Sequence, residues 1–472
     1  MAHDSPSRSP LPCAIDAGVA AVGRAAGALS RFAHVGSGTT LPGRLVNLID
    51  SGFLARRIAR LEQGAVIVSG TNGKTTTASM LRSILRAEGL AVAANTSGAN
   101  LAAGVVSAFL SPKQDAAVGV LEIDEGALPS LIREIRPRLL VLTNVFRDQL
   151  DRFPEPEGVA SRLRIAAERL PADSILVANA DDPLLWAYLE DLDPIGFSVI
   201  ASPDSGADQR GEGGVGAPRL AADAEPESCL RCGAGLVFTR RTMAGLGSAH
   251  CDGCGWGSTV GRYVATLVSR AGIEASVLEL CEELLTLPLG GIHNAYNAVA
   301  AVAAAVELGI APHRAISALE AFHPRFGRAE ELLFDDRHLW LALIKNPAGA
   351  GSVIRDVCTD RRVGAVVVAI SDRDADGRDV SWIWDTEFER LVTLEAPLVA
   401  GGTRGADTAV RLKYAGRVPD VVQADPLAAV RAATRSCPPD GLVAVLGTYT
   451  AMLDIREALV GDRSTRAEDE VE

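Results

Sequence analysis

Short apolar runs that end in polar residues recur along the first half of the chain. Residues 65–70 (AVIVSG) form one such run, and the residues after it carry apolar side chains at helical spacing. Parallel strands that are buried on both faces have this appearance when they alternate with helices. The pattern predicts a parallel α/β sheet with its ligands at the carboxyl ends of the strands. Further runs predict strands at 90–95, 117–123, 139–144 and 174–179.

A helical segment precedes this strand pattern, and a segment without periodicity interrupts it. Residues 14–64 are Ala-rich with helical spacing, whereas residues 202–228 are rich in Gly, Asp, Ala and Pro without periodicity and predict a mobile linker. Two cysteine pairs follow, and the α/β pattern resumes near Ala265. Residues 202–262 are therefore expected to be an insertion in the sheet domain.

A helical stretch at residues 293–320 precedes a second group of apolar runs. These runs predict a smaller C-terminal α/β domain with strands at 339–344, 363–371, 397–402 and 442–447. The expected organisation is a disordered tail over residues 1–12, an α/β domain over 13–330 and a C-terminal domain over 331–472.

Composition excludes several classes of protein. The chain has 46 basic and 59 acidic residues, a net charge of −13, which argues against a general nucleic-acid binder. The apolar stretch from Ala295 to Ile310 is too short for a membrane span. The polar start predicts no secretory signal, and eight cysteines in 472 residues are too few for a disulfide scaffold, so we expect a cytosolic, reduced protein.

The turn after the first strand has the composition of a phosphate-binding loop. Residues 70–76 read GTNGKTT and lie between a predicted strand and a predicted helix. Glycines there let main-chain N–H groups point at phosphate, and the helix N-terminus adds positive potential. We expect Lys74 to reach the β- and γ-phosphates and the Thr75 hydroxyl to bind Mg²⁺. Val68 occupies the place of a glycine in the full Walker spacing.

Acidic residues follow a neighbouring strand. Glu122, Asp124 and Glu125 end the run at 117–123, and hard oxygen ligands of this kind suit Mg²⁺ beside phosphates. Asn144 and Asp148, after the next strand, are candidates for positioning nucleotide, metal or substrate, as is Asp151. A solvated acidic strand end is the alternative for each.

Four cysteines form the pattern C-x₂-C-x₁₈-C-x₂-C: Cys229, Cys232, Cys251 and Cys254. Two such turns can place four thiolates around one tetrahedral Zn²⁺. Because four sulfurs leave no open position, the predicted site is structural, and metal binding would fold an insertion too small for its own core. Unpaired or redox-active thiols are the alternative.

The order of these motifs resembles the Mur ligase family of ATP-dependent amide-forming enzymes. The loop GTNGKTT, the strand-end acid, the run NVFRDQLD, NADD at 179–182 and GIHNAYNA at 291–298 follow one another as in that family. The resemblance implies a parallel-sheet ATPase domain and a smaller C-terminal α/β domain. It also implies ATP and Mg²⁺ as cofactors, with Glu122 on the metal and the following residues on the nucleotide: Gly70, Thr71, Asn72, Gly73, Lys74, Thr75, Thr76, Asn294, Asn297 and Arg328.

Departures from the ordinary members point to a subgroup. Gln149 stands in place of a metal-binding His, Arg162 in place of a carbamylated Lys, and Lys345-Asn346-Pro347 in place of D-Y-A-H-x-P. With KNPAG (345–349), DGRDVSWIWD (376–385) and TYTAML (448–453), the chain is similar to a subgroup that pairs with the glutaminase GatD. By that resemblance an Asp of the second domain completes the partner's triad, and Asp379 and Asp385 are the candidates.

The resemblance implies a reaction and a location. ATP would phosphorylate the α-carboxylate of D-glutamate in lipid II, and ammonia from the glutaminase would convert it to D-isoglutamine in peptidoglycan biosynthesis. The chain would act in the cytoplasm at the inner face of the plasma membrane, without a span of its own. Two alternatives stay open: a stand-alone Mur-type amino-acid ligase, and a non-catalytic zinc- and nucleotide-binding scaffold.

Overall fold

The computed structural model describes residues 10–32, 41–95, 99–110, 116–148, 155–202, 228–323 and 328–460. Its N-terminal helices are α1 (Pro10–Phe32), α2 (Leu41–Ile49) and α3 (Phe53–Ile58). Helix α1 begins at Pro10, so the last three residues of the predicted tail (1–12) belong to this helix. Residues 1–9 of that tail lie outside the described part. None of the described helices combines the length and apolar character that a membrane crossing requires.

The first sheet has nine strands in the order β11-β10-β9-β6-β5-β4-β1-β3-β2. All neighbours from β2 to β9 in this order are parallel, as the apolar runs predict, while β9, β10 and β11 form an antiparallel edge. The strands are β1 (Ala65–Ser69), β2 (Val92–Ala94), β3 (Val118–Glu122), β4 (Leu139–Leu142), β5 (Ile175–Asn179), β6 (Ile195–Ala201), β9 (Tyr263–Ala271), β10 (Ala275–Leu280) and β11 (Glu283–Leu287).

Helices cover both faces of this sheet, which explains why its central strands β1, β3 and β4 are buried at every position and mostly apolar. Val66 and Val68 of β1 pack against α4, α9 and α10, whereas Ala65 and Ile67 face the side of α3, α5, α6, α7 and α8. The helices are α4 (Lys74–Ala87), α5 (Ala102–Ala108), α6 (Leu128–Ile135), α7 (Pro156–Ala167), α8 (Pro183–Leu189), α9 (Ile292–Glu307) and α10 (Pro312–Glu320); a 3₁₀ turn, Glu190–Leu192, follows α8.

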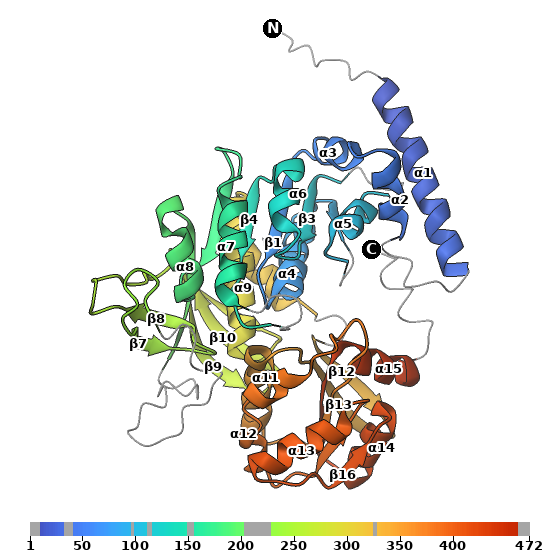
Figure 1. Ribbon diagram of the computed structural model, residues 1–472, viewed down its shortest axis with the longest axis vertical. Helices are drawn as coiled ribbons and strands as arrows, with labels where there is room; N and C mark the ends of the chain where they lie inside the picture. Colours follow the sequence, from blue (N-terminus) through green and yellow to red (C-terminus); the bar gives the residue numbers. More distant parts are fainter. Residues whose placement is uncertain are drawn as a thin grey trace.

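The predicted insertion lies between β6 and β9, which are hydrogen-bonded neighbours in the sheet. Its described part contains a two-stranded antiparallel ribbon of β7 (Val237–Arg241) and β8 (Gly247–His250) beside α8 (Figure 1). The predicted linker falls mainly on residues 203–227, outside the described residues.

A second sheet forms the C-terminal domain, in the order β12-β13-β17-β14-β15-β16. Only β12 is antiparallel to its neighbour. Since β12 begins at Arg328, the predicted boundary at residue 330 lies inside this strand and is slightly too late. The strands are β12 (Arg328–Phe334), β13 (Arg337–Leu343), β14 (Val363–Ala369), β15 (Leu398–Gly401), β16 (Val421–Gln423) and β17 (Leu442–Gly447).

Two apolar clusters fill the faces of the second sheet. Helices α11, α12 and α13 lie on one face with the 3₁₀ helix η4, and α14 and α15 lie on the other. In Figure 1 this domain (orange to red) sits below the first, and its α11 faces the first sheet's lower end. The bounds are α11 (Pro347–Thr359), η4 (Ser381–Asp385), α12 (Glu389–Val392), α13 (Gly405–Ala415), α14 (Pro426–Ser436) and α15 (Tyr449–Val460).

Candidate active site at the domain interface

The loop between β1 and α4 depends on two glycines. Gly70 and Gly73 have φ values of 126° and 86°, a region that side chains disfavour. A Cβ on Gly70 would lie 2.3 Å from the Thr143 hydroxyl oxygen, and one on Gly73 would lie 2.2 Å from the Asn297 side-chain oxygen. The tight curl therefore brings the loop against β4 and α9, and it presents the first turn of α4, which begins at Lys74.

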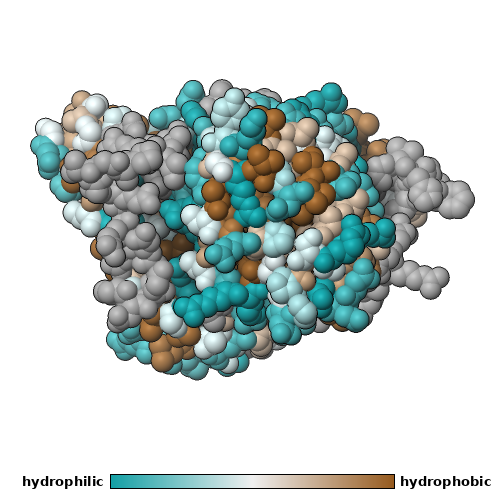
Figure 2. Space-filling view, turned by 90° about the horizontal axis from the view of Figure 1, so that it is seen from below, coloured by the Kyte–Doolittle hydropathy of each residue, from teal (hydrophilic) through white to brown (hydrophobic). Residues whose placement is uncertain are grey.

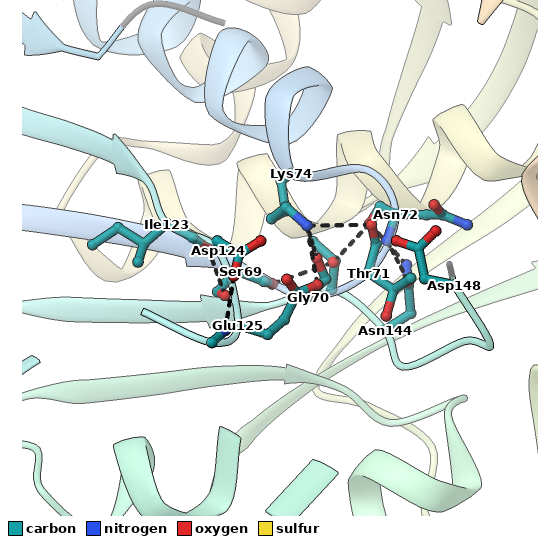
Figure 3. A network of polar contacts seen from close by, with 12 residues as sticks. Ser69, Gly70, Thr71, Asn72, Lys74, Ile123, Asp124, Glu125, Asn144 and Asp148 are labelled. Carbon is teal, nitrogen blue, oxygen red and sulfur yellow. Dashed lines mark hydrogen bonds and ion pairs between the residues drawn. The ribbon is translucent and has the colours of Figure 1, made fainter. Parts of the chain in front are cut away.

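Lys74 is buried at the centre of the loop (Figure 3). Its Nζ donates to the carbonyl oxygens of Gly70 and Thr71 and lies 3.0 Å from Glu125 Oε1. Burial alone would lower the pKa of Lys74, but Glu125 and Glu122 outweigh it and hold that pKa above its usual value. The ammonium group thus stays charged beside the loop, where phosphate oxygens would compete with Glu125 for it.

The Thr75 hydroxyl donates to Glu122 Oε2 over 2.6 Å. Asn95 fixes the end of β3, because its side chain accepts from the Glu122 main-chain N–H at 2.9 Å and donates to the Glu122 carbonyl at 2.8 Å. A hydroxyl and a carboxylate next to a phosphate loop are the hard oxygen donors that Mg²⁺ prefers. Thr75 and Glu122 therefore fit the predicted metal ligands. Thr76, expected at the nucleotide, lies buried in the first turn of α4.

Asn144, at the end of β4, holds the loop from the other side. Its carbonyl accepts from Thr71 N at 2.9 Å, and its side chain both accepts from Asn72 N at 2.8 Å and donates to the Asn72 carbonyl at 3.0 Å. Asn144 therefore positions the loop itself, one of the roles expected for it.

The C-terminal domain closes onto the loop through Lys345 and Asn346, directly after β13. Lys345 Nζ lies 2.9 Å from Asp148 Oδ2 and donates to the Thr71 carbonyl at 3.2 Å. Burial alone would raise the pKa of Asp148, but Lys345 outweighs it and holds the pKa below its usual value. Asn346 exchanges two amide hydrogen bonds with Asn72. Both domains thus contribute a lysine to one loop.

Helix α9 brings Asn294 and Asn297 to the back of the loop. Asn297 accepts from the Thr77 hydroxyl at 3.3 Å and donates to Asn294 at 3.2 Å. Both asparagines are buried. Arg328, the other residue expected at the nucleotide, opens β12, and its side chain is outside the described part of the structure. Gln149 and Asp151 also lie outside it.

The two candidate aspartates of the C-terminal domain have different surroundings. Asp379 accepts from Ser381 N at 2.8 Å, and this bond lowers the pKa of Asp379. Asp385 lies 3.8 Å from an Arg147 guanidinium nitrogen, so it faces the first domain. Neither reaches the phosphate loop through a described contact.

The four predicted cysteine ligands converge. Their sulfur atoms all lie within 4.8 Å of one another, with Cys229–Cys254 at 3.6 Å and Cys232–Cys251 at 3.4 Å. A tetrahedron of Zn–S bonds has S–S edges of about 3.8 Å. Both C-x-x-C turns also close alike, because Gly233 N donates to Cys229 O at 2.8 Å and Gly255 N to Cys251 O at 2.9 Å. The cluster can therefore hold one metal ion.

Sequence reasoning did not place several contacts of this region. The salt bridge of Glu125 with Lys74, and the meeting of Lys345 and Asn346 with the loop, depend on tertiary structure. The sequence marked Lys345 and Asn346 as departures from one motif and as part of the subgroup segment KNPAG, without a contact to the loop. Asp181 lies in the NADD motif and Tyr296 in GIHNAYNA, but neither was assigned a role, and Arg240, which joins them to the ribbon, lies in no motif.

Comparisons with known proteins agree with this geometry. A family described as Mur ligase middle domain matches residues 68–209, and one described as MurT ligase C-terminal matches residues 343–452. The chain is 32% identical to the lipid II isoglutaminyl synthase (glutamine-hydrolyzing) subunit MurT of Streptococcus pneumoniae over 95% of its length and 98% of that protein's. It is 31% identical to the MurT of Staphylococcus aureus strain COL, covering 89% and 93%.

A solved structure shows the same fold. The pseudomurein peptide ligase type C from Methanothermus fervidus superposes with a TM-score of 0.62 at 20% identity, covering 84% of this chain and 78% of that one. The Mur ligase-type sheet with its C-terminal domain is thereby confirmed, and the cysteine cluster is consistent with the predicted ribbon. Because the chain is 31–32% identical to two MurT subunits over nearly their whole length, we conclude that it belongs to the MurT family of Mur ligase-like proteins.

Proposed function

We propose that this chain is the ATP-dependent ligase subunit that amidates the α-carboxylate of D-glutamate in lipid II. The carboxylate attacks the γ-phosphorus of ATP, which gives an acyl phosphate and ADP. Ammonia then attacks the acyl carbon, the C–O bond to phosphate breaks, and a proton leaves the new amide. The substrate class is that named for the MurT relatives of Streptococcus pneumoniae and Staphylococcus aureus.

The observation that carries this proposal is the meeting of two lysines at one loop. Lys74 from the first domain and Lys345 from the second both contact the Thr71 carbonyl, and each is paired with a carboxylate. Two fixed cations would offset the charge that gathers on a transferring phosphoryl group. Phosphates are expected to displace Glu125 and Asp148 as their partners.

Magnesium and zinc have separate roles in the proposal. Thr75 and Glu122 would hold Mg²⁺, which supplies charge neutralisation at the β- and γ-phosphates. Gly70, Thr71, Asn72, Gly73 and Thr76 would surround the phosphates, with Asn294, Asn297 and Arg328 nearer the adenosine. The four cysteines would bind a structural zinc ion, because the site is closed on all sides by sulfur.

A separate GatD-like glutaminase is proposed to supply the ammonia by docking on the C-terminal domain. Trp384 is 50% exposed and Tyr414 75% exposed, and their rings form an edge-to-face pair 5.6 Å apart. Val410, Val418 and Val422 are exposed nearby along the chain, and Figure 2 shows apolar residues between polar ones on this lower side. Exposed aromatics next to the Asp379–Asp385 loop suit a partner surface.

The place of action follows from the substrate. A lipid-linked substrate would be met at the inner face of the plasma membrane, and ATP places the reaction in the cytoplasm. Neither step requires this chain to cross the bilayer.

An ADP-release assay with lipid II and Mg²⁺ tests the proposal. We expect release that depends on ammonium chloride, or on glutamine when the glutaminase is present, and that Lys74→Ala abolishes. Release driven by an amino acid would instead support a stand-alone amino-acid ligase. Full partner-dependent activity in Lys74→Ala would support a non-catalytic scaffold.

A further inference from the structure

The ribbon of β7 and β8 is fixed to the first domain at both of its ends. At the cysteine end, Cys229, Cys251 and Trp256 pack with Trp186 of α8, and Trp256 Nε1 donates to Glu190 at 3.1 Å. At the opposite end, the β7–β8 connection inserts Met243 and Leu246, 5% and 2% exposed, into the main core beside α9. The ribbon that carries the cysteine cluster therefore reaches the interior of the first domain.

Asp181 connects the ribbon to the sheet and to α9. This aspartate, 1% exposed, accepts from Arg240 Nη2 of β7 at 2.7 Å, from Val199 N of β6 at 2.8 Å and from the Tyr296 hydroxyl at 2.8 Å. Its carbonyl accepts from Gly247 N of β8 at 2.6 Å. Because a buried carboxylate without partners is costly, the bonds from Arg240, Val199 and Tyr296 stabilise the Asp181 carboxylate in this position.

Tyr296 and its neighbour Asn297 face two different sites. Burial beside Asp181 raises the pKa of Tyr296 well above its usual value, so its hydroxyl remains a donor. Thr242 of the ribbon lies 2.6 Å from the same hydroxyl. One residue on, Asn297 contacts the Thr77 hydroxyl of α4 and lies against Gly73 of the phosphate loop. The first turns of α9 are thus held between ribbon and loop.

We propose that the metal-loaded ribbon is a positioning element for nucleotide binding, acting through Arg240, Asp181 and Tyr296 on helix α9. The metal orders the two cysteine turns and hence β7. Arg240 then holds Asp181, Asp181 holds Tyr296, and α9 keeps Asn297 against Gly73. This inference rests on the proposed nucleotide site. Arg240 is a positioning residue that needs no contact with ATP.

Calorimetric titration of the full chain with ATP and Mg²⁺ tests the inference. Arg240→Met is expected to weaken ATP binding about tenfold, since it leaves the buried Asp181 short of a charged partner. Arg240→Lys should recover part of the loss. Arg241→Met is the matched control, because Arg241 is the next residue of β7 and stacks on Phe238 at 3.9 Å. Equal losses in Arg240→Met and Arg241→Met would overturn the inference.

Zinc removal gives a second, independent arm. Chelation of the wild-type chain, with zinc content and thermal unfolding followed in parallel, should weaken ATP binding by the same factor as Arg240→Met. The two changes together should add nothing further, because both act through one pathway. A zinc-free chain that stays folded and binds ATP with unchanged affinity would overturn the inference. If the wild-type chain binds ATP normally but does not amidate lipid II, only the proposed function is contradicted and the inference on the ribbon is not.

Discussion

Asn72 of the phosphate loop and Asn346 of the C-terminal domain exchange two amide hydrogen bonds, with N–O distances of 3.1 and 2.9 Å. Asn346 Oδ1 also caps α11 by accepting from Gly349 N at 2.9 Å. The same side chain therefore starts a helix of the second domain and binds the loop of the first. Closure of the two domains and order in the phosphate loop are expected to be coupled through this pair.

Asn72→Ala should separate domain closure from order in the phosphate loop. The amide pair is lost, at a cost of about 1–2 kcal/mol for two hydrogen bonds, while the Asn72 main-chain N–H keeps its bond to Asn144. We expect kcat for amidation to fall about tenfold, with a smaller change in ATP affinity. Glu274→Gln is the control, since it removes an exposed interdomain ion pair with Arg362. Equal effects of both variants on kcat would refute a specific role for the pair.

The Lys74–Glu125 pair predicts a distinction between stability and activity. Lys74→Met should lower the thermal midpoint, because it leaves Glu125 buried without its cation. Adding Glu125→Gln should restore much of the stability, whereas amidation should stay reduced by at least about 10²-fold. Scanning calorimetry and steady-state kinetics on both variants check this. Recovered activity in the double variant would show that Lys74 is only structural.

The Thr75–Glu122 pair predicts a change in the magnesium requirement. Thr75→Val and Glu122→Gln should each raise the Mg²⁺ concentration for half-maximal ADP release about tenfold or more, because each removes an oxygen donor. Thr75→Ser retains the hydroxyl and serves as the control. An unchanged Mg²⁺ titration in both variants would place the metal elsewhere.

The aspartate that serves the glutaminase can be identified by comparing nitrogen sources. Asp385 faces Arg147, whereas Asp379 is held by a main-chain N–H, so we expect Asp379 to be the partner-directed residue. In the complex, Asp379→Asn should reduce glutamine-driven amidation by about 10³-fold or more and leave ammonium-driven amidation intact. The reverse outcome for Asp379→Asn and Asp385→Asn would reassign the role.

Asp356 of α11 predicts a pH dependence of stability. It lies 3.2 Å from Arg270 and 3.6 Å from His293, with Arg355 as a further charge beside it, and burial raises the pKa of Asp356 to about 7. The folded state keeps a proton that the unfolded state releases above about pH 4. The contribution of Asp356 is therefore full at low pH and is lost as the pH rises to about 7.

Asp356→Asn removes this titration. Between pH 5 and pH 7.5, the thermal midpoint of the wild type should fall relative to that of the variant. This range runs from above the usual pKa of an aspartate to just above the raised pKa of Asp356. Burial lowers the pKa of His293 to about 4, so its contribution changes in the opposite sense, between about pH 4 and pH 6.5. A constant difference across this range would contradict the raised pKa.

Local patterns were sufficient to predict most of the parallel strands and the phosphate loop, although β6 and β16 were not predicted. Continuous apolar runs mark strands covered on both faces, and β1, β3, β4 and β5 all followed that rule. The edge strands β10 and β11 were missed because they alternate buried and exposed positions and carry Glu279 and Glu283. The cysteine spacing was equally local, so its convergence could be predicted.

Contacts between distant segments could not be predicted from such patterns. Lys345 meets Thr71 across 274 positions of sequence, and Tyr296 meets Asp181 across 115. Nothing near either residue indicates its partner, because a hydrogen bond between distant segments leaves no periodicity in the chain. Motif order identified the enzyme class, while the geometry of closure required the structure.

The most direct test of the central claim is to follow isotope-labelled oxygen from the D-glutamate α-carboxylate of lipid II during amidation. Phosphorylation of that carboxylate, followed by attack of ammonia on its carbon, predicts one labelled oxygen in the released phosphate for each amide formed. The transfer should require ATP, Mg²⁺ and ammonium, and it should vanish in Lys74→Ala. Amide formation with unlabelled phosphate, or transfer that survives Lys74→Ala, would contradict the proposed acyl phosphate at this site.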